Sequence, residues 1–195
     1  MKKIILILLF LVSYSAINAQ DKVVLDGVVI PRSIDFEKGK LQLNGFGIRS
    51  KMWMDVYVQA LYLTTLSQDP EFILESETPM AIRIEITSGL VTSKKLTKAL
   101  YKGIEKSVGG EEGLRPIRAS VDKLEQLLNS EDTKNKDVFV LAYNPVDTSI
   151  WIYKNDLLRG KISGGVEFKK AFIGIWLSKN PVDADLKNDL LGLGN

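Results

Sequence analysis

The sequence predicts an α+β fold: a large antiparallel β-sheet with helices packed on one face. Short apolar segments with strand-like alternation and turn residues between them come first, two amphipathic helical segments interrupt them, and further strands and a helix follow. Separate runs of strands and helices are typical of α+β domains. The sequence contains no internal repeat and no low-complexity segment, so residues 20–195 are expected to form one domain.

Residues 1–19 have the layout of a secretory signal peptide. Two lysines precede an apolar run from Ile4 to Val12, and a stretch of small or weakly polar residues follows. The apolar run is too short to span a bilayer, and an alanine suits the position before a cleavage site. We therefore expect cleavage between Ala19 and Gln20, and an exported protein that is periplasmic or secreted.

The composition excludes several classes of chemistry. The 195 residues include no cysteine and no histidine, which excludes disulfides, thiolate metal sites and histidine-dependent catalysis. The 26 basic and 24 acidic residues become equal in number without the two leader lysines, which gives no support for nucleic-acid binding. No acidic pair has a spacing that demands a metal, and no cofactor is expected. No later apolar run is long enough for a membrane span.

The first elements are read from turns and alternation. Two short strands are expected at Val23–Leu25 and Val28–Ile30, because Asp26-Gly27 breaks the apolar pattern between them. A polar turn at Glu37–Lys40 precedes a pair of strands over Leu41–Leu63, which ends in a run of branched and aromatic strand formers.

The next elements have clear start signals. Asp69 and Pro70 predict a short helix over Glu71–Glu75, because a capping side chain followed by proline is typical of a first turn. Strict alternation in Met80–Thr87 predicts a strand with one face on the core and the other on water or a polar partner. Thr92 is expected to cap a helix that ends near Val108.

That helix carries a row of lysines opposite its apolar side, at Lys94, Lys95, Lys98 and Lys102. A solvated face is the usual role of such a row, and an anionic docking site is the alternative. The remaining elements are expected in this order: a helix over Pro116–Leu128, strands at Asp137–Tyr143, Ser149–Tyr153 and Leu157–Ile162, and helices over Val166–Leu177 and Asp183–Leu191.

The stretch from Leu43 to Leu63 contains the main candidate for a functional residue. Arg49 follows Gly45 and Gly47 in apolar surroundings, and glycine in a strand indicates a bulge or the close approach of another group. Arg49 and Tyr57 could provide a cation and a hydroxyl at the mouth of an apolar cleft. Alternatively, Arg49 lies in solvent at a strand end, loosely paired with Asp55.

Three motifs resemble the chalcone isomerase-like family, specifically its exported bacterial branch. They are LNGFGIRSKMWMDVYVQALYL, TSKKLTKALYKGIEK and GGVEFKKAFIGIWLSKNPVDADLKNDLLG, which together extend from about Leu41 to Gly192. The resemblance implies an open-faced β-sandwich. It also implies one of two roles: ring closure of a chalcone with an arginine as electrophile, or binding of a fatty acid whose carboxylate an arginine and a strand tyrosine hold.

Arg49 matches the family arginine, and Tyr57 resembles the fatty-acid-binding pattern. Leu96 stands where catalytic members have a tyrosine, and Gly103 where they have an asparagine, which argues against chalcone cyclisation. The residues expected to contact a ligand are Arg49, Tyr57, Tyr62, Leu96 and Leu100.

Three hypotheses follow. The first is a non-catalytic exported binder of a fatty acid or similar amphipathic carboxylate, anchored by Arg49 through charge-assisted hydrogen bonds. The second is an isomerase or intramolecular lyase in which Arg49 is the catalytic electrophile. The third is a structural or partner-binding protein of the cell envelope.

Overall fold

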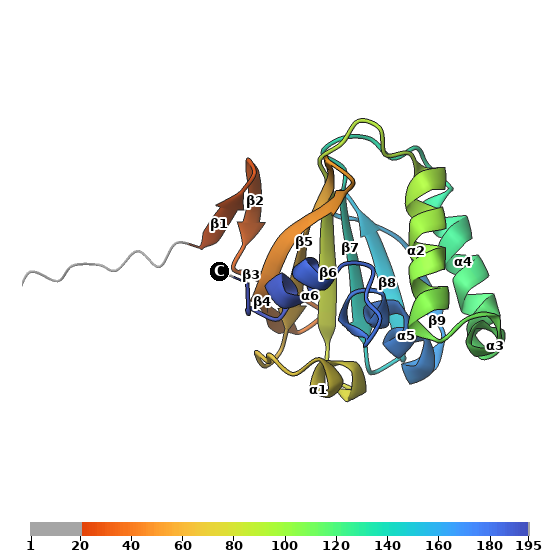
Figure 1. The fold of residues 1–195 in the computed structure, drawn as a ribbon. Helices are drawn as coiled ribbons and strands as arrows, with labels where there is room; N and C mark the ends of the chain where they lie inside the picture. Colours follow the sequence, from red (N-terminus) through yellow and green to blue (C-terminus); the bar gives the residue numbers. More distant parts are fainter. Residues whose placement is uncertain (1–20, 195) are drawn as a thin grey trace, which may run out of the picture.

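The computed structural model describes residues 21–194, and the predicted signal peptide and its cleavage site lie outside these residues. The predicted α+β architecture is confirmed: a twisted antiparallel sheet carries helices on one side and a small β-hairpin on the other (Figure 1). No helix among the described residues is long and apolar enough to cross a membrane.

The main sheet has seven strands in sequence order, so each strand pairs with its neighbour in the chain. Its strands are β3 (Ser33–Phe36), β4 (Gly39–Lys51), β5 (Met54–Leu63), β6 (Met80–Ile86), β7 (Val138–Asn144), β8 (Ser149–Lys154) and β9 (Leu157–Ser163). Strands β1 (Lys22–Leu25) and β2 (Val28–Pro31) form a separate hairpin.

The helices come from two insertions in the sheet and from the C-terminal segment. They are α1 (Pro70–Glu75), α2 (Ser93–Ser107), α3 (Glu111–Leu114), the 3₁₀ turn η1 (Arg115–Ile117), α4 (Arg118–Leu128), α5 (Gly165–Leu177) and α6 (Ala184–Leu190). The expected caps are present, since Asp69 accepts hydrogen bonds at the start of α1 and Thr92 does so at the start of α2.

One helix was expected over residues 116–128, and the structure divides this region. The chain passes through α3 and the 3₁₀ turn η1 before α4 begins at Arg118. Pro116 lies in that turn, and proline has no backbone N–H to donate to the preceding turn. The rest of the expected helix is confirmed, since α4 ends at Leu128 as predicted.

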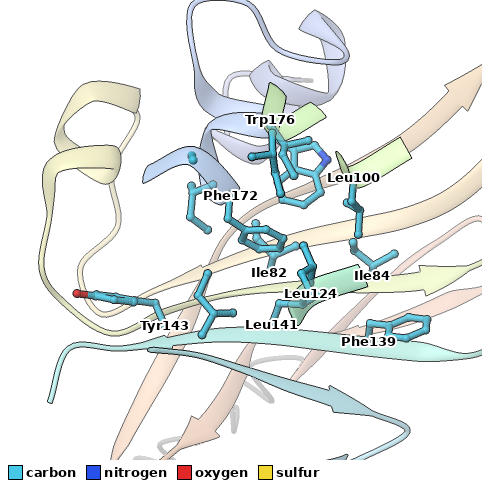
Figure 2. Close-up of a cluster of buried hydrophobic side chains, with 14 of the residues drawn as sticks. Ile82, Ile84, Leu100, Leu124, Phe139, Leu141, Tyr143, Phe172 and Trp176 are labelled. Atoms are coloured by element: carbon cyan, nitrogen blue, oxygen red, sulfur yellow. The ribbon is translucent and has the colours of Figure 1, made fainter. Parts of the chain in front are cut away.

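The main core lies between the sheet and the helices. Phe172 and Trp176 of α5 pack over Ile82 and Leu141 of the central strands (Figure 2). The rings of Phe172 and Trp176 meet edge to face, with centroids 5.5 Å apart. Burial of such large apolar side chains is the main stabilising contribution of this layer.

A second core covers the opposite face of the sheet beneath the β1–β2 hairpin. Tyr62 is fully buried there, and its hydroxyl donates a hydrogen bond to the Pro31 carbonyl at 2.9 Å. One face of β6 was expected to meet water or a polar partner, and this is wrong at Ala81, which is buried in the second core. Farther along the same face, Arg83 and Glu85 form an ion pair at 2.7 Å.

Candidate functional site

Arg49 and Tyr57 lie directly opposite each other on β4 and β5. Residues opposite one another in an antiparallel pair project to the same face, and here that face is the one the helices cover. Tyr57 is only 7% exposed, and its hydroxyl accepts a hydrogen bond from the Trp176 Nε1 at 3.1 Å. Burial raises the pKa of Tyr57 to about 12, so the hydroxyl stays protonated at neutral pH.

The counter-ion of Arg49 is Asp183, which immediately precedes α6. The Arg49 Nη1 lies 2.9 Å from the Asp183 Oδ2 and also donates to the Ser50 carbonyl. The expected pairing of Arg49 with Asp55 is wrong, since Asp55 accepts a hydrogen bond from the Ser50 hydroxyl instead. The Nε and Nη2 groups of Arg49 donate to no residue among 21–194.

Gly45 and Gly47 project to the same face as Arg49 and lie against α6. A Cβ at Gly45 would lie 2.5 Å from the carbonyl oxygen of Leu190, and one at Gly47 would lie 2.7 Å from the Asp189 Cβ. The expected close approach of another group is therefore the docking of α6. The Gly-x-Gly-x-Arg motif therefore forms the docking site of α6. The two glycines leave room for the helix, and Arg49 pairs with Asp183 at its N-terminus.

A small cavity of about 130 Å³ adjoins Arg49. Its apolar walls come from β5, α2, α5 and the segment before α6, with Leu96, Leu100 and Ile175 among them. Tyr57 also lines it, so the structure brings four of the five expected ligand contacts to one place.

The cavity adjoins an open groove of about 620 Å³ between the β4–β5 hairpin and α2. The two hollows share five lining residues: Lys51, Val56, Tyr57, Leu96 and Ala99. Met54, Leu90 and Val91 extend the apolar lining outward, and lysines line the groove as well. The volume falls within the range of about 300–1,000 Å³ that is usual for small-molecule sites.

Tyr62 does not belong to this group, contrary to the expectation. It projects to the opposite face of the sheet and is enclosed under the β1–β2 hairpin. Its hydroxyl is committed to the Pro31 carbonyl, so it cannot contact a ligand beside Arg49 without unfolding that hairpin.

Trp176 and Asp183 are the contacts that the sequence did not reveal. Asp183 could have been recognised from the sequence as the N-cap of α6, because aspartate is a preferred residue at that position. In the structure its carboxylate accepts hydrogen bonds from two backbone amides of the helix. Its pairing with Arg49, however, spans 134 positions of the chain and depends on how α6 docks. The same is true of Trp176, which reaches Tyr57 from α5.

A larger depression of about 840 Å³ lies at the other end of α2, against α1 and the end of α5. Its lining mixes acids and lysines, including Glu71, Glu75, Lys106 and Lys187, and excludes Arg49 and Tyr57. This charged lining fits a small-molecule site less well than the groove beside α2 does, since such sites combine an apolar lining with few polar groups. Among the described residues no cluster of acids could hold a metal ion.

Comparison with known proteins supports the fold. The crystal structure of a fatty-acid binding protein from Arabidopsis thaliana superposes with a TM-score of 0.71 at 16% sequence identity. The match covers 87% of this chain and 95% of that one. No curated protein matches the sequence. The resemblance read from the motifs is confirmed: the family model described as chalcone isomerase-like matches residues 22–192, and the chain therefore belongs to the chalcone isomerase-like family.

Proposed function

We propose that the protein is an exported, non-catalytic binder of a fatty acid or similar amphipathic carboxylate. One observation carries this proposal: an apolar groove runs into a cavity at which Arg49 and Tyr57 stand side by side with uncommitted donors. The likeness to a plant fatty-acid binding protein supports the same ligand class.

Arg49 would hold the carboxylate. Its side chain is 22% exposed, so a ligand can approach it, and its Nη1 alone is occupied by Asp183 and Ser50. The Nε and Nη2 edge can still donate two parallel, charge-assisted hydrogen bonds to a carboxylate. Asp183 partly neutralises the charge of Arg49. We therefore expect a modest affinity for the carboxylate, which depends on the Nε and Nη2 edge of the guanidinium.

Tyr57 would donate a further hydrogen bond. Its oxygen accepts from Trp176, while its own proton is given to no residue in the described part of the chain. A buried donor without a partner costs about 1–3 kcal/mol, which a bound oxygen would recover. The ligand tail would then lie along Val56 and Leu96 toward the groove.

The site offers little for catalysis by proton transfer. The sequence lacks histidine, and Tyr57 has a raised pKa that makes it a poor base at neutral pH. Leu96, which takes the place of the tyrosine of catalytic relatives, supplies only apolar surface to the cavity. Arginine-only electrostatic catalysis by Arg49 is the alternative, and turnover of an enone that Arg49→Ala abolishes would establish it.

The test is uptake of a long-chain fatty acid by delipidated protein, followed by native mass spectrometry and by displacement of a fluorescent fatty acid. We expect Arg49→Ala and Tyr57→Phe to weaken binding, by about tenfold or more for Arg49. Arg115→Ala, at an exposed arginine on η1, is the matched control and should bind like wild type. Wild-type protein that takes up no fatty acid, or an Arg49→Ala variant that is folded and binds normally, would refute the proposal.

A further inference from the structure

Met52 and Trp53 form the two-residue turn of the β4–β5 hairpin. Their side chains are 84% and 91% exposed. The connection from β6 to α2, which contains the exposed Leu90, reaches the same end of the molecule (Figure 1). A contact of 3.6 Å between the Ser88 hydroxyl and the Met54 sulfur links this connection to the hairpin. Together these residues make an apolar protrusion, which we call the tip: Met52, Trp53 and Leu90.

The turn residues are poor choices for a hairpin. Met52 has a φ of 59°, a conformation that glycine or asparagine usually provides in two-residue turns. The chain uses suitable residues elsewhere, with Asp26-Gly27 and Asn155-Asp156 at positive φ between β1 and β2 and between β8 and β9. Met52 and Trp53 are almost fully exposed at this turn, so their large apolar side chains contribute little packing to the fold. A departure from local preference without structural compensation is typical of a functional surface.

Positive charge gathers beside the tip. Five exposed lysines lie on the hairpin end and on α2, at Lys51, Lys94, Lys95, Lys98 and Lys102. Lysines in the first turn of a helix oppose its dipole, and this first turn contains no acid to offset them. Asp55 is the only acid of β4 and β5, and the Ser50 hydroxyl donates to it.

The loop between α4 and β7 reaches the same end and contains acids (Figure 1). Two of them are already matched by cations, since Glu131 pairs with Arg159 at 2.7 Å and Asp137 with Lys154 at 3.0 Å. Asp132 is exposed, and Lys134 and Lys136 lie in the same loop. Among residues 21–194, no acid forms an ion pair with Lys51 or with the four α2 lysines beside the tip.

We propose that the tip docks on the surface of an anionic lipid bilayer. Tryptophan favours the boundary between headgroups and acyl chains, because its ring is apolar and its N–H needs a polar partner. Lysines beside such an anchor keep their charges among anionic headgroups while their aliphatic stems cover apolar surface. A few apolar side chains with a basic margin have the chemistry of a reversible interfacial anchor.

Docking in this way places the groove at the bilayer. Met52 and Leu90 of the tip also line the groove, as do the neighbouring Met54, Lys51 and Lys98. An apolar ligand could then pass between the bilayer and the groove without crossing water. The docking surface itself consists of exposed residues and does not depend on whether Arg49 binds a carboxylate.

Cosedimentation of the processed protein, residues 20–195, with vesicles tests the proposal. Vesicles of phosphatidylglycerol and phosphatidylcholine should retain the protein, while pure phosphatidylcholine vesicles should retain far less. Binding should weaken as sodium chloride rises from about 0.1 M to about 0.5 M, because salt screens exposed charges. The fluorescence of Trp53 should shift to shorter wavelength, and brominated lipid should quench it.

Two sets of variants locate the contact. Trp53→Ser should abolish the fluorescence shift and weaken binding at least tenfold, whereas Val146→Ser, at an equally exposed apolar residue in the β7–β8 turn, should not. Replacing Lys51 and Lys98 together by glutamine should weaken binding about 25-fold, at about fivefold for each lysine. Replacing Lys123 and Lys179, which are exposed elsewhere, is the matched control.

Equal retention on neutral and anionic vesicles would overturn the proposal, and so would wild-type behaviour of the tip variants. A tip that instead governs self-association in solution, with no vesicle binding, would refute it as well. Wild-type protein that takes up fatty acid normally but binds no vesicles would reject the docking alone. Vesicle binding without uptake would reject the proposed function alone.

Discussion

Asp183 connects the candidate ligand anchor to the last helix: its Oδ2 lies 2.9 Å from the Arg49 Nη1. The other oxygen of the same carboxylate accepts hydrogen bonds from the backbone amides of Asp185 and Leu186, each at 3.1 Å, at the start of α6. One side chain therefore caps a helix and neutralises part of the guanidinium. These two roles can be separated by substitution.

Asp183→Asn should keep the cap and remove the charge. Asparagine is as good an N-cap as aspartate, so the unfolding free energy should fall by less than about 1 kcal/mol, the usual range for a partly exposed ion pair. Without its counter-ion, Arg49 should bind an anionic ligand more tightly, and fatty-acid affinity should rise severalfold. Titration with a fluorescent fatty acid measures this, and unchanged or weaker binding would contradict a carboxylate role for Arg49.

Asp183→Ala provides the comparison. It also frees Arg49, but it removes the cap, which is worth about 1 kcal/mol at a typical helix start. Urea denaturation should therefore show a larger loss of stability than in Asp183→Asn. Equal stability of the two variants would mean that the hydrogen bonds to the α6 amides contribute nothing.

Gly45→Ala should displace α6. The added methyl group would lie 2.5 Å from the Leu190 carbonyl oxygen and 2.6 Å from its carbon, and backbone cannot move aside as a side chain can. We expect a loss of about 2 kcal/mol or more in unfolding free energy, as for overpacked cores. Gly39→Ala on the same strand is the control, since its nearest neighbour is 3.8 Å away. A Gly45→Ala variant as stable as Gly39→Ala would mean that α6 is not seated on this strand.

The sequence predicted the features that depend on nearby residues. Asp26-Gly27 marks a hairpin turn, and Thr92 caps α2, because turn and cap geometry are set within a few positions. It also indicated a close approach at Gly45, without naming what approaches. The partner could not be derived, because the position of α6 depends on packing across the whole chain.

Tyr62 shows where the alternation of side chains along a strand was a better guide than aromatic character. Successive side chains of a strand project to opposite faces, so residues five positions apart in an unbroken strand cannot share one. Tyr57 and Tyr62 both lie in β5, which has no bulge between them in its pairing with β6. The period of two was sufficient to exclude Tyr62 from the Arg49 cavity.

Tyr62→Phe should therefore affect stability and not ligand binding. It removes the hydrogen bond to the Pro31 carbonyl, which attaches the β1–β2 hairpin to the sheet, at a cost of about 1 kcal/mol. Thermal denaturation should show the loss, while the fatty-acid titration should match wild type. Weakened binding in Tyr62→Phe, together with normal binding in Tyr57→Phe, would place the ligand on the wrong side of the sheet for our proposal.

Export predicts processing of the N-terminus. When the full chain is produced in a bacterium with a secretion pathway, the purified protein should begin at Gln20. Intact-mass measurement of the exported fraction checks this, with a variant in which Ala19 is replaced by a bulky residue as the control. An unprocessed protein that stays in the cytoplasm would contradict the predicted signal peptide.

Lys169 provides a pH-dependent prediction. Its side chain is fully buried on α5, and its amine donates to the carbonyls of Leu74 and Ser76 at the end of α1. The amine also lies 5.6 Å from the centre of the Tyr143 ring. Burial lowers the pKa of Lys169 to about 8, since a charged amine loses its hydration in the core.

The sign of the effect follows from proton binding. Between about pH 8 and the ordinary lysine pKa of 10.5, the unfolded chain holds a proton at this site that the folded chain releases, so stability from this residue rises with pH. The slope is at most about 1.4 kcal/mol per pH unit. Below about pH 8 both states are protonated and the cost of burying the charge is present in full.

Urea denaturation from about pH 7.5 to about pH 10 measures this slope in wild type and in Lys169→Met. The variant lacks the titrating amine, so wild-type stability minus variant stability should increase with pH across the range. Taking the difference cancels the tyrosines, whose titration at high pH is common to both proteins. Lys179→Met, at an exposed lysine, should instead give a curve parallel to wild type. A difference that stays constant or falls with pH would show that the Lys169 amine remains charged in the folded core, held there by the two carbonyls of α1.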